Sequence, residues 1–171
     1  MNRSQQELDW TVRPVQRRDL PAVIDLIDRV YREYGERMHL DNADADLPVA
    51  DSHFARLGGA FVVLEHGANI VGCHAVKPLN VADKVLTFRR LYLSQECRGT
   101  GQGTARMEWA ITWATTAGWR RIEFWSDTRF TRAHRFFEKF GFQRDGRIRE
   151  MDDSYEPYQE YGYYLDLQID T

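Results

Sequence analysis

Several features that define common protein classes are scarce or absent in this sequence of 171 residues. It has only two cysteines, Cys73 and Cys97, and their spacing fits neither a metal site nor a disulfide framework, so we expect reduced thiols and no bound metal. No apolar run approaches the roughly 18 residues that a membrane span needs. The start of the chain carries Glu7 and Asp9 and lacks the apolar segment of a secretion signal. These absences predict a cytoplasmic protein without a membrane partner.

An excess of positive charge is also missing. Lys and Arg together number 23 and Asp and Glu 26, which gives a formal net charge of −3 and argues against nucleic acid as the main partner. Hydrophobic residues make up 43% of the chain and charged residues 29%, a composition typical of globular domains. Because no linker or internal repeat divides the chain, we predict a single domain over residues 1–171.

Two familiar phosphate-binding motifs are absent as well. The Walker loop requires a Gly-Lys pair, which occurs nowhere in the chain, and the dinucleotide fingerprint requires Gly-x-Gly-x-x-Gly. The chain instead has Gly99, Gly101 and Gly103 at every second position, between a β-prone run that ends at residue 93 and a helical pattern that begins near residue 102. Free N–H groups at the start of that helix, with Arg98 beside them, form a natural phosphate site. The alternative is an ordinary glycine-rich turn before a helix.

The first half of the chain has the periodicity of a strand, a helix and a hairpin. Residues 1–8 are polar and are predicted to be frayed, and a strand is expected over 10–15. Asp19 is expected to cap a helix that has Pro21 in its first turn and ends near residue 34 or 35. The pattern then predicts a short helix over 52–57 and a hairpin with strands over 60–65 and 70–76.

An acidic stretch interrupts these patterns between residues 35 and 51. It holds Asp41, Asp44, Asp46 and Asp51. One interpretation is a solvated loop, and the other is an acidic rim that attracts a cationic substrate. In both interpretations these side chains are exposed to solvent.

The second half of the chain alternates strands and helices. A strand over 85–93, the glycine turn, a helix over 102–117 and a strand over 119–126 form a βαβ unit, so the two strands are predicted to be parallel neighbours. Another helix follows, with a cap at Asp127 or Thr128, and is expected to end at Gly141. Further strands are predicted from Phe142 onward, over 146–151 and over 160–167, with an acidic, tyrosine-rich connection over 152–158.

Two motifs in this half stand in the order and at the spacing of a known family. Arg98, Gly101 and Gly103 form Arg-x-x-Gly-x-Gly, and about 35 residues later stands the segment Ala133-His134-Arg135-Phe136-Phe137-Glu138-Lys139-Phe140-Gly141-Phe142. That segment is similar to Ala-x-x-Leu-Tyr-Glu-Lys-Leu-Gly-Phe, so the chain resembles the GNAT superfamily of N-acetyltransferases. The resemblance implies an α+β (mixed α/β) fold, with a central mixed, mostly antiparallel, twisted sheet of six to seven strands flanked by about four helices. It also implies a splayed parallel strand pair that forms a wedge for acyl-CoA.

The function that this resemblance implies is transfer of an acetyl group from acetyl-CoA to a primary amine by direct attack in a ternary complex. The acceptor is expected to be small, and cationic if the acidic stretch is a rim. Pantetheine is expected to pair with the strand backbone in the wedge, and the pyrophosphate to lie on the turn. The backbone N–H of Leu93 is expected to polarise the thioester carbonyl. The implied cofactor-binding residues are Leu91, Tyr92, Leu93, Arg98, Gly99, Thr100, Gly101, Gln102, Gly103, Thr104, His134 and Phe137.

Two positions depart from the family pattern. Thr87 stands near where members often have a glutamate as general base, and Phe137 stands where they often have a tyrosine as general acid. His74 and Asp127 are the predicted catalytic replacements for the base, with Glu123 as a further candidate. Candidates to supply a hydroxyl group from the far side of the site are Tyr155, Tyr158, Tyr161 and Tyr163. Each of these side chains has a structural role as its alternative.

These departures leave two other classes of function open. One is a non-catalytic acyl-CoA-binding sensor, which needs neither an acid nor a base. The other is a phosphate-ligand module of a different fold, which the second motif disfavours. The sequence also leaves a homodimer open and does not identify the acceptor amine.

Overall fold

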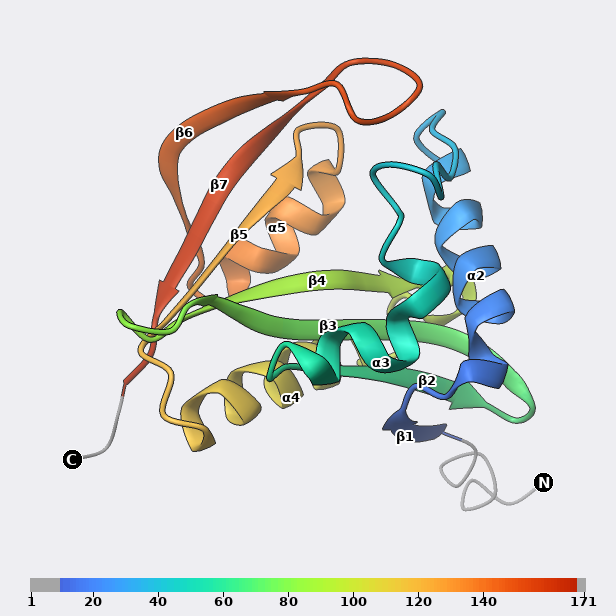
Figure 1. The fold of residues 1–171 in the computed structure, drawn as a ribbon, viewed down its shortest axis with the longest axis horizontal. Coiled ribbons are helices and arrows are strands. Elements are labelled where there is room, and N and C mark those ends of the chain that lie inside the picture. Colours follow the sequence, from blue (N-terminus) through green and yellow to red (C-terminus); the bar gives the residue numbers. More distant parts are fainter. Residues whose placement is uncertain (1–9, 169–171) are drawn as a thin grey trace.

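The computed structural model describes residues 10–168, which form one seven-stranded sheet with helices on both faces (Figure 1). The frayed start predicted over residues 1–8 lies outside the described residues. The strands are β1 (Trp10–Pro14), β2 (Ala60–His66), β3 (Asn69–Asn80), β4 (Val85–Leu93), β5 (Arg121–Asp127), β6 (Gln143–Met151) and β7 (Tyr158–Asp166). The helices are α2 (Leu20–Arg32), α3 (Ala50–Arg56), α4 (Gln102–Thr116) and α5 (Thr131–Lys139), and the short 3-10 turns are η2 (Arg17–Asp19), η3 (Leu47–Val49) and η4 (Gln95–Cys97).

The strand order is β1-β2-β3-β4-β5-β7-β6. Every neighbouring pair is antiparallel except β4 with β5, which is parallel and connected through α4. A parallel pair needs a crossover connection, and a helix is the usual one. The predicted βαβ unit is therefore confirmed, and so is the predicted mixed, mostly antiparallel fold class.

The parallel pair is joined only at its start. Val85 pairs with Arg121 and Leu86 with Ile122, and no further rung joins the two strands in the part of the chain that the structure describes. Farther along β4, Arg90 has a left-handed φ of 57° at a shift in the register with β3. Such a β-bulge bends the strand and increases its twist. β4 and β5 consequently diverge toward their carboxyl ends, as Figure 1 shows.

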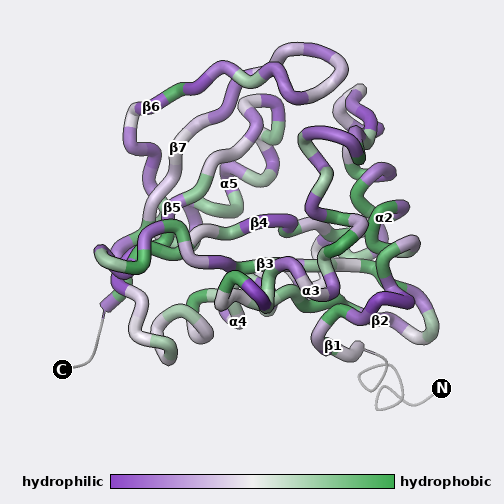
Figure 2. The backbone as a smooth tube through the Cα atoms, in the orientation of Figure 1, coloured by the Kyte–Doolittle hydropathy of each residue, from purple (hydrophilic) through white to green (hydrophobic). Residues whose placement is uncertain are grey.

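Two hydrophobic cores lie on opposite faces of the sheet. Val23, Ile27 and Phe54 of α2 and α3 pack against β2 and β3 in one core. Met107 of α4 and Phe137 of α5 pack against β4, β5 and β7 in the other. These residues are the apolar faces of their helices, at the spacing that an amphipathic helix requires. Figure 2 shows the complementary pattern along the edge strand β6, where hydrophilic residues predominate.

The start of α2 is held by a polar contact rather than by a helix cap. Asp19 precedes the helix, and Pro21 lies in its first turn, as expected. The Asp19 carboxylate accepts from the N–H of Gln16 at 2.7 Å and from Nη1 and Nη2 of Arg13 at 2.6 and 2.8 Å. It does not accept from a helix N–H. This contact fixes β1 to the first turn of α2.

Several predicted boundaries differ from the structure. β3 continues to Asn80, four residues beyond the predicted end of this strand at residue 76. β6 is one strand, because Gly146, with φ of 87°, lies at a shift in register instead of ending a strand. α5 begins at Thr131, because Asp127 remains in β5 and pairs with β7.

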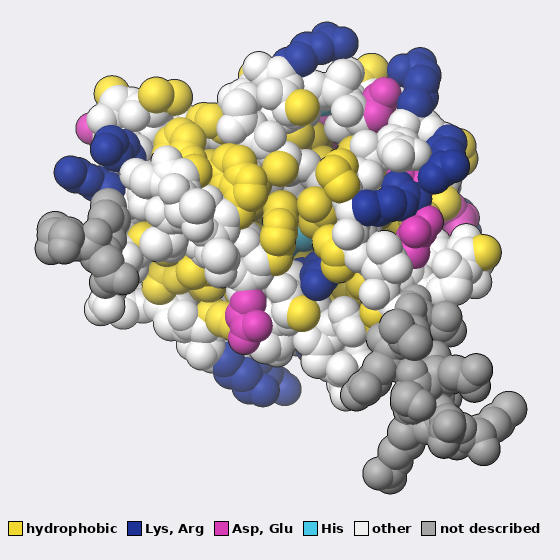
Figure 3. Space-filling model, turned by 90° about the horizontal axis from the view of Figure 1, so that it is seen from below, with side chains coloured by type: hydrophobic (Ala, Val, Ile, Leu, Met, Phe, Trp, Pro, Cys, Tyr) yellow, Lys and Arg dark blue, Asp and Glu magenta, His cyan; other side chains and the backbone are white. Residues whose placement is uncertain are grey.

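Helix α4 carries apolar side chains on more than one side. Met107 and Ala110 are buried against the sheet, whereas Trp109 and Trp113 are half-buried on other sides of the helix. Figure 3 views the molecule from below and shows hydrophobic side chains gathered on that face. Among the described residues, no helix has both the length and the apolar character of a membrane span.

Candidate active site

The glycine turn between η4 and α4 has a backbone conformation that favours glycine. Gly99 and Gly101 have φ of 77° and 86°, which strain any residue that carries a Cβ atom. Gly101 is the N-cap of α4. Within the described chain, the N–H groups of Gly101 and of residues 102–104 have no backbone acceptor. Free donors at the positive end of a helix fit the phosphate site that the sequence predicts.

Gly103 and Arg98 complete the surroundings of this turn. A Cβ atom at Gly103 would lie 3.3 Å from Cδ1 of Leu93, so the glycine lets α4 pack closely against β4. Arg98 donates Nη2 to Glu33 Oε1 at 3.0 Å, and its Nη1 is buried without a hydrogen-bond partner. An orphaned guanidinium nitrogen on a residue three positions before the free N–H groups suits an anionic ligand such as a pyrophosphate.

The backbone of β4 presents donors to the gap between β4 and β5. Ser94 donates its N–H to the carbonyl of Val71 on β3 at 2.8 Å. Because the backbone groups of a strand alternate in direction, the N–H of Leu93 points away from β3 and toward the gap. Leu91, two residues earlier, has the same orientation. The two residues expected to contact pantetheine through their backbone therefore face one open edge.

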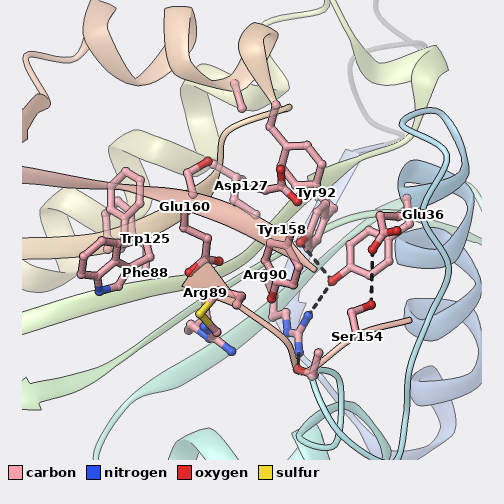
Figure 4. A pocket seen from close by; sticks show the side chains of 18 of the residues that line it. Glu36, Phe88, Arg89, Arg90, Tyr92, Trp125, Asp127, Ser154, Tyr158 and Glu160 are labelled. Atoms are coloured by element: carbon pink, nitrogen blue, oxygen red, sulfur yellow. Dashed lines mark hydrogen bonds between the residues drawn. The ribbon is translucent and has the colours of Figure 1, made fainter. Parts of the chain in front are cut away.

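A cavity of about 180 Å³ lies beside this gap (Figure 4). Its walls come from β4, β5 and β7, and α5, the β6–β7 loop and the segment after α2 close it. Five carboxylates and three guanidinium groups line it: Glu36, Asp44, Asp127, Asp153, Glu160, Arg89, Arg90 and Arg149. This excess of carboxylates favours a cationic ligand.

Glu160 of β7 holds one free carboxylate oxygen in this cavity. Its backbone pairs with Asp127 of β5 on one side and with Arg149 of β6 on the other. Arg149 donates Nε to Oε2 of Glu160 at 2.6 Å, whereas no hydrogen bond reaches Oε1 from any described residue. Burial raises the pKa of Glu160 above its ordinary value, and the charge of Arg149 opposes that rise. A buried carboxylate with a free oxygen and a raised pKa has the properties of a general base.

Asp127 is largely occupied by its neighbour Arg129. Its Oδ1 accepts from the backbone N–H and from Nε of Arg129, both at 2.9 Å, and its Oδ2 accepts from Nη2 at 2.6 Å. The same Nη2 lies 3.6 Å from Oε2 of Glu36. Glu36 Oε2 also accepts from Ser154 Oγ at 3.3 Å, and no hydrogen bond from the described residues reaches Oε1. Of these two carboxylates, Glu36 has the oxygen that a ligand can reach.

The acidic stretch after α2 is not the exposed surface that the sequence indicated. Asp44 is 1% exposed and accepts from Nη1 of Arg90 at 2.8 Å. Asp46 accepts from Nε of Arg90 at 3.0 Å, and the hydroxyl of Tyr31 donates to Asp44 at 2.9 Å. The expectation was wrong for Asp44 and Asp46, because both turn inward to accept hydrogen bonds from Arg90. Asp41 is exposed.

The two histidines singled out from the sequence lie outside the cavity lining. His74 is fully buried, with Nδ1 at 3.3 Å from the carbonyl of Arg106, and burial lowers its pKa to about 3. His134 on α5 is 3% exposed, with Nε2 at 3.2 Å from Ser126 Oγ, and burial lowers its pKa too. Both rings pack between the sheet and a helix. We therefore assign neither a contact with substrate.

The positions that depart from the family pattern supply no proton here. Thr87 is buried and is not part of the cavity lining, whereas Phe137 lines the cavity and packs edge-on against Phe124. Tyr158 also lines the cavity, where its hydroxyl donates to Asp153 Oδ1 at 2.8 Å. The other side chains named as acid or base candidates are not in the lining: Glu123, Tyr155, Tyr161 and Tyr163.

The charged cavity residues that the sequence did not single out include Glu160, Arg149 and Glu36. The available signal for Glu160 was a carboxylate near the start of a strand rich in tyrosine. The position of Glu160 in the cavity becomes evident only when β7 is placed between β5 and β6, because that strand order makes Asp127 and Arg149 the neighbours of Glu160. Residues 10–168 contain no group of three or more His, Cys, Asp or Glu side chains arranged to hold a metal ion.

Comparisons with known proteins agree with this fold. A model of the acetyltransferase (GNAT) family matches residues 21–142. A GNAT-family acetyltransferase from Staphylococcus aureus Mu50 is 17% identical, with a TM-score of 0.80 over 93% of this chain and 99% of that chain. An acetyltransferase from Streptococcus agalactiae 2603 is 19% identical, with a TM-score of 0.81 over 94% and 99%. A phosphinothricin acetyltransferase from Sinorhizobium meliloti, solved with AcCoA, is 16% identical, with a TM-score of 0.73 over 94% and 89%. No curated protein matches the sequence.

The splayed parallel pair and the glycine turn before α4 are features that the resemblance to the GNAT superfamily implied. The family match covers well over half of the described residues. The chain belongs to the GNAT family of acetyltransferases, as its two motifs indicated.

Proposed function

We propose that this protein transfers the acetyl group of acetyl-CoA to a primary amine of a small cationic acceptor, with Glu160 as general base. The observation that carries the proposal is the free Oε1 of Glu160 in a cavity beside the β4–β5 gap. The carboxylate excess in the lining supports a cationic acceptor. Arg129 pairs with Asp127 at 2.6 Å from outside the lining, which leaves an excess of one negative charge.

Acetyl-CoA fits the groups around the glycine turn and the gap. The N–H groups of residues 101–104 and the guanidinium of Arg98 would hold its pyrophosphate. The backbone of Leu91 and Leu93 would hold the pantetheine arm. Acetyl-CoA supplies a thioester whose carbonyl carbon an amine can attack. The complex of the S. meliloti relative with AcCoA supports this choice of co-substrate.

The proposed step needs a base more than it needs an acid. The amine nitrogen forms a bond to the acetyl carbon, the C–S bond breaks, and Oε1 of Glu160 takes the proton that the nitrogen loses. The N–H of Leu93 donates to the carbonyl oxygen as negative charge develops there. The thiolate that leaves has a reference pKa near 8.5, so it takes a proton from water at little cost, whereas an alkyl ammonium has a pKa near 10.4. Because the leaving thiolate needs an acid less than the amine needs a base, the proposed reaction is compatible with phenylalanine at position 137.

Substitution of the proposed base tests the mechanism. Glu160→Gln should lower kcat with the best amine by about a hundredfold or more at neutral pH, because a positioned base contributes at least that much. In the native protein kcat/KM should fall as the pH drops through the raised pKa of Glu160, and the variant should lack that fall. Calorimetry should give the same affinity for CoA in both proteins.

The matched control is Glu150→Gln, which removes an exposed carboxylate from the neighbouring strand β6 and should leave the rate unchanged. Native activity in Glu160→Gln would remove Glu160 as the base.

A non-catalytic acyl-CoA sensor is the second candidate, and Thr87 and Phe137 at the usual positions of the base and the acid favour it. CoA binding without release of thiol in the presence of any amine would decide for the sensor.

A further inference from the structure

We infer that the acceptor is a diamine or polyamine, and that Glu36 binds its second ammonium group while Glu160 receives the amine that reacts. The inference rests on the proposed acetyltransferase function and names the substrate class of the same cavity. It starts from a shared property of Glu36 and Glu160. Each has one carboxylate oxygen held by the protein and the other, Oε1, without a hydrogen bond from any described residue.

The charge of Glu36 is poorly compensated by the protein. Its side chain is 12% exposed, and its ion pair with Arg129 has an N–O distance of 3.6 Å. The other contact is a hydroxyl from Ser154 at 3.3 Å. A nearly buried carboxylate is costly unless a cation or strong donors surround it. An ammonium group at the free oxygen supplies that cation.

The placement of the two carboxylates suits a ligand with two separated cationic ends. Glu36 comes from the segment after α2 and Glu160 from β7, and in Figure 4 they lie on opposite sides of Tyr158. The aromatic side chains of Tyr31, Tyr92 and Tyr158 line the cavity with them. A methylene chain packs against such rings, and ammonium groups are attracted to their faces.

The guanidinium groups of the cavity do not favour a carboxylate on the acceptor. Arg90 is held by Asp44 and Asp46, and Arg149 is held by Glu160. Arg89 has no ion pair within 4.0 Å among the described residues, but its charge lowers the pKa of Glu160, so this carboxylate already balances part of it. An amino acid would leave Glu36 uncompensated, whereas a diamine satisfies both free oxygens.

A series of acceptors tests the inference directly. Linear α,ω-diaminoalkanes of increasing length are compared, in a thiol-release assay with acetyl-CoA, with monoamines and α-amino acids of the same chain length. We expect kcat/KM to be about tenfold or more higher for the best diamine than for its matched monoamine, which is the effect of one charge-assisted hydrogen bond. The advantage should peak at one chain length, because the span between the two carboxylates is fixed.

Glu36→Gln separates recognition from catalysis. The variant should raise KM for the best diamine about tenfold and leave kcat/KM for the matched monoamine unchanged, because only the second ammonium group loses its partner. The control is Asp25→Asn, which removes a carboxylate from the exposed side of α2 and should change neither value. Recovery of the diamine advantage in Glu36→Asp, at a longer optimal chain, would support direct contact.

The outcomes distinguish this inference from the function on which it rests. Equal turnover of diamines and monoamines, or a preference for amino acids, would overturn the inference and leave the acetyltransferase proposal standing. A diamine advantage that survives in Glu36→Gln would remove Glu36 as the subsite. Absence of transfer to every amine, with intact CoA binding, would overturn both.

Discussion

Arg90 and Asp44, which are 46 positions apart in the chain, form an ion pair with Nη1 and Oδ1 at 2.8 Å, and their side chains are 5% and 2% exposed. Asp46 and Tyr31 bind the same guanidinium group. The contact joins the β-bulge of β4 to the segment after α2, and Arg90 and Asp44 both line the cavity. The segment that carries Glu36 is therefore fixed in place from inside the protein.

Asp44→Asn should destabilise the fold rather than weaken attraction of the substrate. It removes the charge of one of the two carboxylates that hold the buried Arg90 guanidinium, while Asp46 still pairs with it. The loss of charge-assisted hydrogen bonds at Asp44 should lower the free energy of unfolding by about 2 kcal/mol. Urea denaturation measures this change. Asp41→Asn, at an exposed position of the same stretch, should change stability by less than about 0.5 kcal/mol. Equal stability of the two variants would contradict the role of the pair.

Gly101→Asp should weaken binding of CoA about tenfold or more, a loss of about 1.4 kcal/mol. The side chain would place a negative charge beside the N–H groups that the pyrophosphate needs. Gly118→Asp is a close control, because Gly118 follows the other end of α4 with a φ of 82°, against 86° for Gly101, and a Cβ atom meets nothing within 4 Å at either position. Calorimetry should show unchanged affinity in the control. Equal losses in both variants would point to backbone strain instead of the anion site.

Arg149→Met should move the acidic limb of the kcat/KM profile to higher pH. Burial raises the pKa of Glu160 and Arg149 holds it down, so removal of the guanidinium lets the pKa rise further. The base is then protonated up to a higher pH. Arg147→Met is the control, because Arg147 also lies over the Trp125 ring but pairs with Asp145. An unshifted limb in Arg149→Met would mean that another group titrates.

His74 should make the fold sensitive to mild acid. Its pKa is about 3 in the folded protein and near 6.5 in the unfolded chain, so only the unfolded chain takes up a proton as the pH falls below 6.5. The free energy of unfolding should therefore fall by about 1 kcal/mol per pH unit below pH 6. Denaturation curves between pH 6.5 and 5 should show a smaller slope in His74→Leu. His53→Leu, which removes a half-buried histidine elsewhere in the chain, is the control variant.

The elements around the glycine turn were predictable because their signals are local. β4 has the bounds that its β-prone run predicts, and α4 ends one residue before its predicted end. The left-handed backbone at positions 99 and 101 favours glycine, so the spacing of the glycines in the sequence was enough to locate this turn. A motif whose residues are set by the local backbone conformation can be recognised without knowledge of the tertiary structure.

The charged part of the cavity was not predictable for the opposite reason. Asp44 and Asp46 read as surface residues, because their partner Arg90 lies on a distant strand and takes a left-handed φ that arginine does not prefer. Glu160 acquires its neighbours from the order β5-β7-β6, which no spacing in the sequence encodes. His74 shows the same limit, since a histidine on a strand carries no mark in the sequence of whether it faces a helix or a ligand.

Only two residue pairs join β4 to β5 in the described chain. The sheet therefore consists of two half-sheets, β1–β4 and β5–β7–β6, and these two pairs form a short seam between them. A ligand arm that hydrogen-bonds along β4 beyond that seam adds rungs where the protein has none. It is expected to stiffen the joint, so that amide exchange at Leu91 and Leu93 slows in the CoA complex. Removal of CoA should take those added rungs away and return amide exchange at both positions to the rate of the free protein, so that the proposed ligand would act as a temporary strand of the sheet.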